Sequence, residues 1–104
     1  MLEFLAMKDV SALDRVRAIV LRFLRGHPAE IYLFGSYARQ TARPGSDIDV
    51  GIAARRPLPV GLLPALREAL EESTIPQRVD VVDLSTTSAE FAAAVKGQGI
   101  KWSD

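Results

Sequence analysis

The sequence predicts an α/β (α+β) protein in which a small mixed β-sheet is flanked by helices. Apolar residues recur at steps of three and four in the segments 11–25 and 62–72, which is the spacing of amphipathic helices. Short apolar or alternating runs at 31–34, 47–53 and 79–84 have the length of strands. Helical and strand segments alternate along the chain, as is typical of helices packed against a sheet.

The composition limits the class of protein. A chain of 104 residues suits one domain with a real core, and we expect residues 1–104 to form a single domain. Lys and Arg total 13, as do Asp and Glu, and this neutral balance argues against direct binding of duplex nucleic acid. The absence of cysteine excludes a disulfide framework and suits a cytoplasmic protein. No segment approaches the roughly 20 apolar residues of a membrane span, so we expect no membrane association.

The first helix is expected over residues 11–25. Ser11, with an acid three residues further on, resembles a capping box and marks the predicted start. Gly26 and Pro28 mark its end, because glycine favours helix termination and proline cannot continue a helix. The only histidine, His27, falls in this stop and is interpreted as a loop residue.

The middle of the chain predicts strand, turn and strand. Residues 31–34 should form a buried strand, after which Gly35 and Ser36 turn the chain into a short helix around residues 37–41. A Pro-Gly turn follows. Residues 47–53 alternate acidic and apolar side chains, which predicts a strand with one face toward the core and the other available for chemistry.

The last third predicts helix, strand and helix. A loop with two prolines over 55–61 precedes a second amphipathic helix over 62–72. Residues 79–84 form the third predicted strand. The run Thr87-Ser88-Ala89-Glu90 has the pattern of a capping box, so a final helix should open there and run through Val95.

Three aspartates carry the main chemical signal. Asp47 and Asp49 are two residues apart in one predicted strand, so their carboxylates should share a face about 6–7 Å apart along the chain. Asp80 lies among valines in another strand, where an unpaired charge is costly. If these strands are neighbours, the acids form one cluster, and such a cluster can hold two Mg²⁺ ions about 3.5–4 Å apart for phosphoryl transfer.

Two alternatives to this interpretation stay open. An isolated Asp-x-Asp also occurs at polar strand edges, so the pair alone is weak evidence. Asp83 is another possible third acid. It is an odd step from Asp80 and should face the opposite side of the strand, so we interpret it as a helix-capping or loop residue.

Gly35 and Ser36 form a candidate phosphate site. They follow an apolar strand and precede a predicted helix, where free backbone N–H groups favour anions. Glycine allows a phosphate to approach the backbone closely, and the serine hydroxyl adds a donor. The alternative is a plain strand-to-helix turn with Ser36 as its N-cap. The loop lacks the lysine of a Walker-type site.

Together, these motifs resemble a known signature. Gly35-Ser36, ten intervening residues, Asp47-x-Asp49 and a later strand acid are similar to the pattern of the polymerase-β-like nucleotidyltransferase superfamily. The run GSYARQTARPGSDIDV resembles its small stand-alone branch, the minimal nucleotidyltransferase (MNT) domain. The resemblance implies transfer of a nucleoside monophosphate from a nucleoside triphosphate to a hydroxyl. It further implies that Gly35 and Ser36 bind the nucleotide, that Asp47 and Asp49 bind Mg²⁺ and nucleotide, and that Asp80 binds one metal and helps to deprotonate the attacking hydroxyl.

The resemblance also implies a partner. The sequence shows no added helical domain of the kind that larger relatives use to hold an acceptor, so we expect the acceptor on a second protein. Many minimal domains of this type are antitoxins paired with a small helical HEPN toxin. The implied reaction is transfer of AMP from ATP to a toxin hydroxyl, with tyrosine preferred, within a homo- or hetero-oligomer. Two alternatives remain: a non-catalytic antitoxin that masks its partner sterically, and a catalytic subunit of a small-molecule (aminoglycoside-like) nucleotidyltransferase.

The sequence leaves three further residues open. Arg39 and Arg43 either contact phosphates or face solvent. Trp102 is either exposed, as an interface anchor of the kind common at binding hot spots, or packed on the body of the protein.

Overall fold

The computed structural model describes residues 2–103, with side chains described from residue 11 onward. It contains a four-stranded sheet and three helices in the part of the chain described. The elements follow in the order α1 (Leu2–Phe23), β1 (Ala29–Phe34), β2 (Ile48–Ala54), α2 (Leu62–Glu72), β3 (Val79–Asp83), α3 (Ala89–Gln98) and β4 (Ile100–Lys101).

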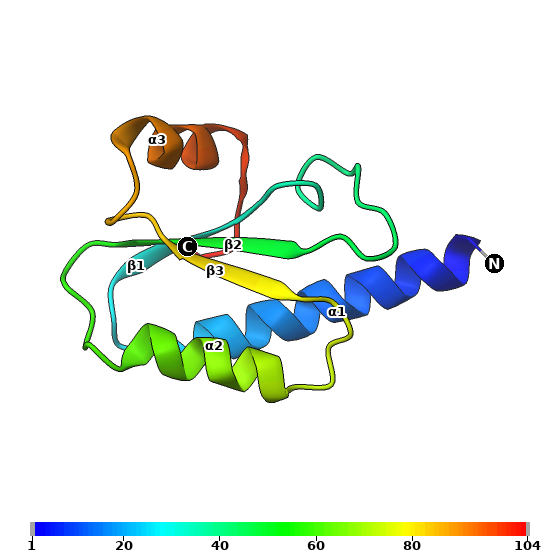
Figure 1. Cartoon of the computed structure of the whole chain (residues 1–104), viewed down its shortest axis with the longest axis horizontal. Helices are drawn as coiled ribbons and strands as arrows, with labels where there is room; N and C mark the ends of the chain where they lie inside the picture. The colour runs from blue at the N-terminus through cyan, green and yellow to red at the C-terminus, as the bar shows by residue number, and fades with distance from the viewer. Residues whose placement is uncertain (1, 104) are drawn as a thin grey trace.

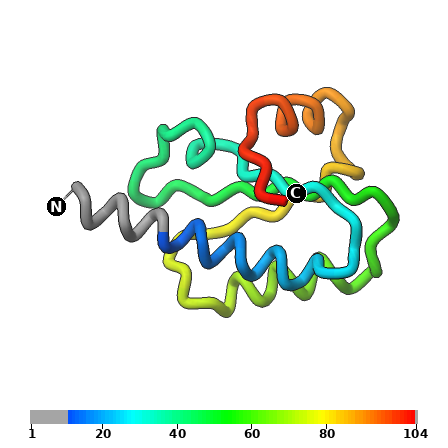
Figure 2. Tube along the Cα trace, turned by 180° about the vertical axis from the view of Figure 1, so that it is seen from behind, coloured from blue at the N-terminus to red at the C-terminus, as the bar shows by residue number. Residues whose placement is uncertain are grey.

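The sheet has the strand order β3-β2-β1-β4. Strand β1 is antiparallel to both β2 and β4, whereas β2 and β3 are parallel. Helices α1 and α2 lie along one face of the sheet and α3 lies over the other, as Figure 1 shows and the reverse view in Figure 2 confirms. The predicted fold class, a small mixed sheet flanked by helices, is therefore confirmed.

The main core lies between the sheet and the α1/α2 layer. Along β2, the alternate residues Ile48, Val50 and Ile52 are fully buried in this core. Because side chains alternate across a strand, Asp49 and Gly51 project to the other face, on the side of α3. The predicted division of this strand into a core face and a face available for chemistry is confirmed.

Helix α3 packs closely on the second face over Gly51, which has no side chain. A side chain at Gly51 would place its Cβ 3.1 Å from Leu84 and 3.2 Å from Val95. Leu84 and Val95 are buried there together with Tyr32, in a second, smaller apolar cluster. The absence of a side chain at Gly51 thus lets α3 rest over part of the sheet and leaves the rest of that face open.

Two predicted helix starts are wrong. Ser11 lies within α1, which begins at Leu2, because residues 2–10 include leucine, methionine and alanine, which favour a helix. The N-cap of α3 is Ser88 rather than Thr87: the Ser88 hydroxyl accepts a hydrogen bond from the Phe91 N–H at 3.1 Å. Helix α3 also continues beyond Val95.

The predicted short helix around residues 37–41 is also wrong. The Arg39 N–H donates to the Gly35 carbonyl at 3.1 Å and the Thr41 N–H to the Ser36 carbonyl at 2.9 Å, which closes single turns. Gly35 and Gln40 have positive φ values of 74° and 61°, and a left-handed residue interrupts a right-handed helix. The segment is therefore a turn, and no helix dipole supports an anion there.

Strand bounds shift by one or two residues from the prediction. Strand β1 begins at Ala29 and β2 begins at Ile48, so Asp47 lies immediately before the strand that was predicted to contain it. Helix α2 agrees with the prediction at both ends. His27 lies in the bend between α1 and β1, as expected for a loop residue.

The C-terminal segment was not predicted as a strand. Strand β4 pairs with β1, after which the Trp102 N–H donates to the Ile31 carbonyl at 2.7 Å. Trp102 is buried in the main core, so its side chain packs on the body of the protein and does not serve as an exposed interface anchor. None of the helices in residues 2–103 has the length and hydropathy needed to cross a membrane.

Candidate nucleotidyl-transfer site

The parallel pairing of β2 and β3 brings the predicted acids together. Asp49 on β2 stands directly opposite Asp80 on β3 in the strand register. Asp47, two residues before Asp49, adjoins the same end of the sheet. Asp49 and Asp47 are half-buried, and Asp80 is exposed. The expectation that these two strands are neighbours is confirmed.

The electrostatics of Asp49 show that the three carboxylates share one field. Burial raises the pKa of Asp49, the negative charges of Asp80 and Asp47 raise it further, and the Arg39 guanidinium partly offsets them. Like charges held together favour the protonated form unless a cation neutralises them. Within residues 11–103, no three carboxylate or imidazole side chains are already arranged to hold a single ion, so ligation would draw on the phosphate oxygens of the substrate as well.

The raised pKa of Asp49 predicts a pH dependence. In the folded protein Asp49 binds its proton more tightly than in the unfolded chain, so the contribution of Asp49 to stability is fully present below the ordinary aspartate pKa. Stability is then lost as the pH rises toward the raised value. Thermal melts in metal-free buffer should show this loss in the wild type and less of it in Asp49→Asn. A pH profile identical in the two proteins would contradict the repulsion.

Gly35 lies against Asp49. A Cβ added to Gly35 would collide with Asp49 Oδ2, so the carboxylate or the turn would have to shift. Gly35 also has φ of +74°, which glycine adopts without steric cost. Two features therefore favour glycine at position 35: its backbone conformation and its closeness to the Asp49 carboxylate. Gly35 follows Phe34, which pairs with Asp49 across β1 and β2.

Ser36 does not act as a helix cap. Among residues 11–103 its hydroxyl has no hydrogen-bond partner; only its backbone carbonyl is used, by Thr41. The alternative that Ser36 serves as an N-cap is not supported. Ser36 is half-buried, and its hydroxyl is available for a ligand next to Gly35.

The chain returns from Ser36 to Asp47 through a tight turn. The Arg43 N–H donates to Ser46 Oγ at 2.8 Å, and the Ser46 N–H donates to the Arg43 carbonyl at 2.9 Å. Gly45 supplies the positive φ of 89°. Arg39 and Arg43 are both exposed, and the charge of Arg39 lowers the pKa of Asp49 against the effects that raise it.

Two hollows lie near the strands that carry the carboxylates, one on each face of the sheet. The first, of about 240 Å³, lies between α3 and the Gly35 turn and is lined by Phe34, Gly35, Arg39, Phe91, Ala94, Val95 and Gln98. The second, of about 580 Å³, lies between α2 and β3 and has Asp80 in its wall. Sequence reasoning missed the α3 residues of the first hollow, because no motif marks them.

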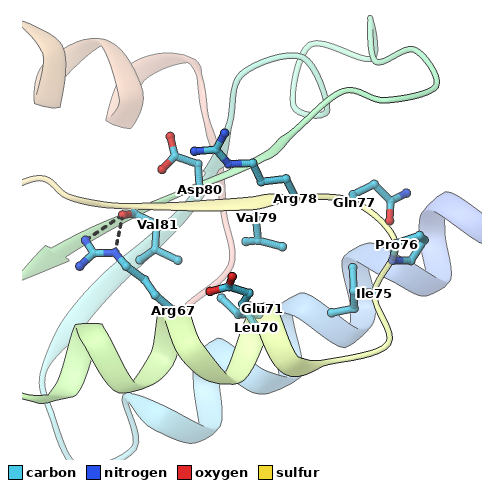
Figure 3. Close-up of a pocket in the computed structure, with 10 residues that line it drawn as sticks. All are labelled: Arg67, Leu70, Glu71, Ile75, Pro76, Gln77, Arg78, Val79, Asp80 and Val81. Atoms are coloured by element: carbon cyan, nitrogen blue, oxygen red, sulfur yellow. Dashed lines mark hydrogen bonds between the residues drawn. The ribbon is translucent and has the colours of Figure 1, made fainter.

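Figure 3 shows how the second hollow is related to Asp80. Val79 and Val81 point toward α2, whereas Arg78 and Asp80 point away from it, toward the face that carries Asp49. The Arg67 side chain donates to the Val81 carbonyl from Nη2 at 2.9 Å and from Nε at 3.3 Å. Strand β3 is an edge strand, so Asp80 can be approached from outside the sheet.

Asp83 is engaged elsewhere. Its Oδ1 accepts hydrogen bonds from the Ser85 N–H at 2.9 Å and from the Ser85 hydroxyl at 2.6 Å. These bonds fix the turn after β3. Asp83 is the last residue of β3 rather than a loop or helix-capping residue, but its carboxylate serves the turn after the strand and does not join Asp80.

The fold and the geometry define a nucleotidyltransferase-like domain: a mixed sheet with opposed aspartates on neighbouring strands, and a Gly-Ser turn against one of them. Comparison with known families agrees, because the family described as "Polymerase beta, Nucleotidyltransferase" matches residues 21–101. The chain belongs to this family. The resemblance inferred from the motifs is therefore confirmed.

Individual relatives include a protein adenylyltransferase and toxin–antitoxin structures. The chain is 36% identical over 66 residues to the "Probable protein adenylyltransferase MntA" of Haemophilus influenzae, which covers 64% of this chain and 58% of the length of that relative. A crystal structure of a toxin–antitoxin with AMP-PNP is 31% identical with a TM-score of 0.66, over 84% of this chain and 72% of the other. The toxin–antitoxin MntA-HepT is 27% identical with a TM-score of 0.60, over 86% and 71%.

Proposed function

We propose that this chain is a Mg²⁺-dependent adenylyltransferase that moves AMP from ATP to a tyrosine hydroxyl of a helical HEPN-type toxin, and so acts as an antitoxin. The observation that carries the proposal is the register of the sheet, which sets Asp49 opposite Asp80 while the Gly35 backbone touches Asp49. In this view residues 1–104 form one minimal nucleotidyltransferase domain that works in the cytoplasm, in a hetero-oligomer with its toxin.

The donor set fits magnesium. Asp47, Asp49 and Asp80 offer only oxygen atoms, which Mg²⁺ prefers, and the raised pKa of Asp49 shows a site that a cation would relieve. Asp47 and Asp49 would hold two ions together with phosphate oxygens, and Asp80 would share one of them. When bound, the ions neutralise charge on the phosphates during an in-line displacement.

The other residues of the site bind the triphosphate and activate the acceptor hydroxyl. The Gly35 and Ser36 N–H groups and the Ser36 hydroxyl bind triphosphate oxygens. Asp80 takes the proton of the acceptor hydroxyl. The hydroxyl oxygen of the acceptor forms a bond to the α-phosphorus of ATP, and the bond from that phosphorus to pyrophosphate breaks. Asp80 is exposed on the edge strand, so the acceptor enters from the open edge of the sheet at β3, on the face that carries Asp49.

The comparisons support a protein acceptor. The curated relative is named a protein adenylyltransferase, and solved structures of similar chains are toxin–antitoxin pairs. The alternative, an antitoxin that only covers its toxin and catalyses no transfer, is less favoured. A surface that only binds a partner has no need of carboxylates that repel one another.

A transfer assay tests the proposal. The purified chain is incubated with its neighbouring toxin, ATP and Mg²⁺, and intact-protein mass spectrometry should show the toxin gaining the mass of AMP on a tyrosine. Omission of Mg²⁺ should stop the transfer. A toxin that is neutralised with unchanged mass would support masking instead, and transfer to an aminoglycoside alone would support the small-molecule reaction.

Ser36→Ala provides a finer prediction. Because the hydroxyl has no partner among the described residues, the melting temperature should stay close to that of the wild type. Loss of a hydrogen bond to a charged phosphate should cost about 1.5–3 kcal/mol of transition-state stabilisation, which lowers kcat/KM roughly 10- to 150-fold. If Ser36→Ala lost stability but retained kcat/KM, Ser36 would have a structural role and would not bind phosphate.

A further inference from the structure

We propose that the hollow between α3 and the Gly35 turn holds the nucleobase of the bound nucleotide, and that Phe91 and Gln98 select adenine. This inference rests on the proposed function, because it adds a base site to the same triphosphate. The hollow has a volume of about 240 Å³, which suits a planar base.

The hollow adjoins the phosphate site directly. Gly35 forms part of its wall and also touches the Asp49 carboxylate. Arg39 lies at its rim and contributes a positive charge that Asp49 senses. A nucleotide whose phosphates lie at Gly35 therefore has this hollow within the reach of its sugar and base.

The wall has the chemistry of a stacking site. Phe34 and Phe91 meet edge to face, with centroids 5.8 Å apart and planes at 86°. This contact holds the Phe91 ring in place, although 42% of the residue is exposed. A fixed, exposed aromatic ring is a platform for a base, since every base presents a π-face. It is also a large apolar group left in water beside a charged site.

Gln98 supplies a polar group at the end of the same helix. Its amide offers both a donor and an acceptor, the pair that matches the N6 and N7 atoms of adenine. Guanine presents two acceptors at the corresponding edge, so the glutamine carbonyl would face an acceptor. Gln98 therefore favours adenine over guanine.

The alternative occupant, an aromatic side chain of the acceptor, fits the hollow less well. The acceptor hydroxyl must reach Asp80, and Asp80 does not line this hollow. Asp80 lies on the edge strand β3, whereas this hollow adjoins Phe34 and Gly35 at the end of β1. This arrangement gives the nucleotide and the acceptor separate entrances.

The test fills the hollow without disturbing the core. Ala93 and Ala94 are both exposed in α3, but only Ala94 lines the hollow. Leucine is well tolerated on an exposed helix surface, so Ala94→Leu and Ala93→Leu are matched variants. Calorimetry with Mg²⁺ measures binding of ATP, GTP and inorganic tripolyphosphate to each protein.

We expect Ala94→Leu to weaken ATP binding about tenfold or more while tripolyphosphate binding is unchanged, and Ala93→Leu to change neither. Phe91→Ala should weaken ATP binding similarly, and Phe91→Tyr should retain it. Gln98→Leu should narrow the preference for ATP over GTP. Wild-type ATP affinity in both Ala94→Leu and Phe91→Ala would overturn the base site but not the proposed function. An unchanged preference for ATP over GTP in Gln98→Leu would overturn the role of Gln98 in the base site. A wild type that binds neither ATP nor tripolyphosphate would overturn the proposed function together with it.

Discussion

Asp49→Asn is expected to abolish AMP transfer while the protein stays folded. The substitution keeps the shape of the side chain and removes a charge that Asp80 and Asp47 repel. In metal-free buffer at neutral pH the melting temperature should therefore stay level or rise, as often happens when a functional site is neutralised. Asp47→Asn should behave in the same way for activity. Both results are checked by thermal melts and by mass spectrometry of the toxin.

The matched control is Asp14→Asn, an exposed aspartate on α1, which lies on the opposite face of the sheet (Figure 1). It should leave transfer unchanged. If Asp49→Asn transferred AMP at the wild-type rate, the role of this carboxylate in holding metal and nucleotide would have to be abandoned.

Gly35→Ala is expected to damage both stability and activity. The left-handed backbone at φ of +74° costs a residue with a side chain about 1–2 kcal/mol. The methyl group would also collide with Asp49 Oδ2 at 2.2 Å, so the carboxylate or the turn must move. A displacement of about 1 Å at a reacting centre can lower the rate about 100-fold, and we expect a loss in kcat/KM of at least that size.

Gly45→Ala separates the two causes. Gly45 has a similar φ of +89°, but nothing lies within 4 Å of its added Cβ. It should lose stability to a similar degree through backbone strain and retain most of its transfer activity. If both variants lost activity equally, the closeness of Gly35 to Asp49 would have no functional meaning. Denaturant unfolding and kcat/KM measured on the same preparations give this comparison.

Much of the fold could be predicted from local patterns. The second helix, α2, has both ends where its periodicity placed them, because a strongly amphipathic run specifies its own buried side. The strand that carries Asp49 was predicted with the right face toward the core, since alternation fixes both faces at once. Helix starts were less predictable: Ser11 has the residue type of a cap but lies inside α1.

The short turn after β1 shows why local patterns fail. A Gly-Ser following a strand is compatible with a helix, and the prediction followed that preference. In the structure Gly35 and Gln40 take left-handed conformations, and the chain turns back toward β2 instead. Packing of Gly35 against Asp49 decides the conformation, and that contact joins residues from different strands.

The sequence by itself determined the fold class, the family and the three acids of the candidate site, because residue type, spacing and alternation are local properties of the chain. Only the tertiary structure decided which elements meet. It set Asp80 opposite Asp49 through the parallel pairing of β2 and β3, buried Trp102 against the sheet, and placed Phe91 of α3 beside Gly35. These are contacts between residues far apart in the chain, and their free energy comes from burying the faces of whole elements against one another, which no single segment encodes.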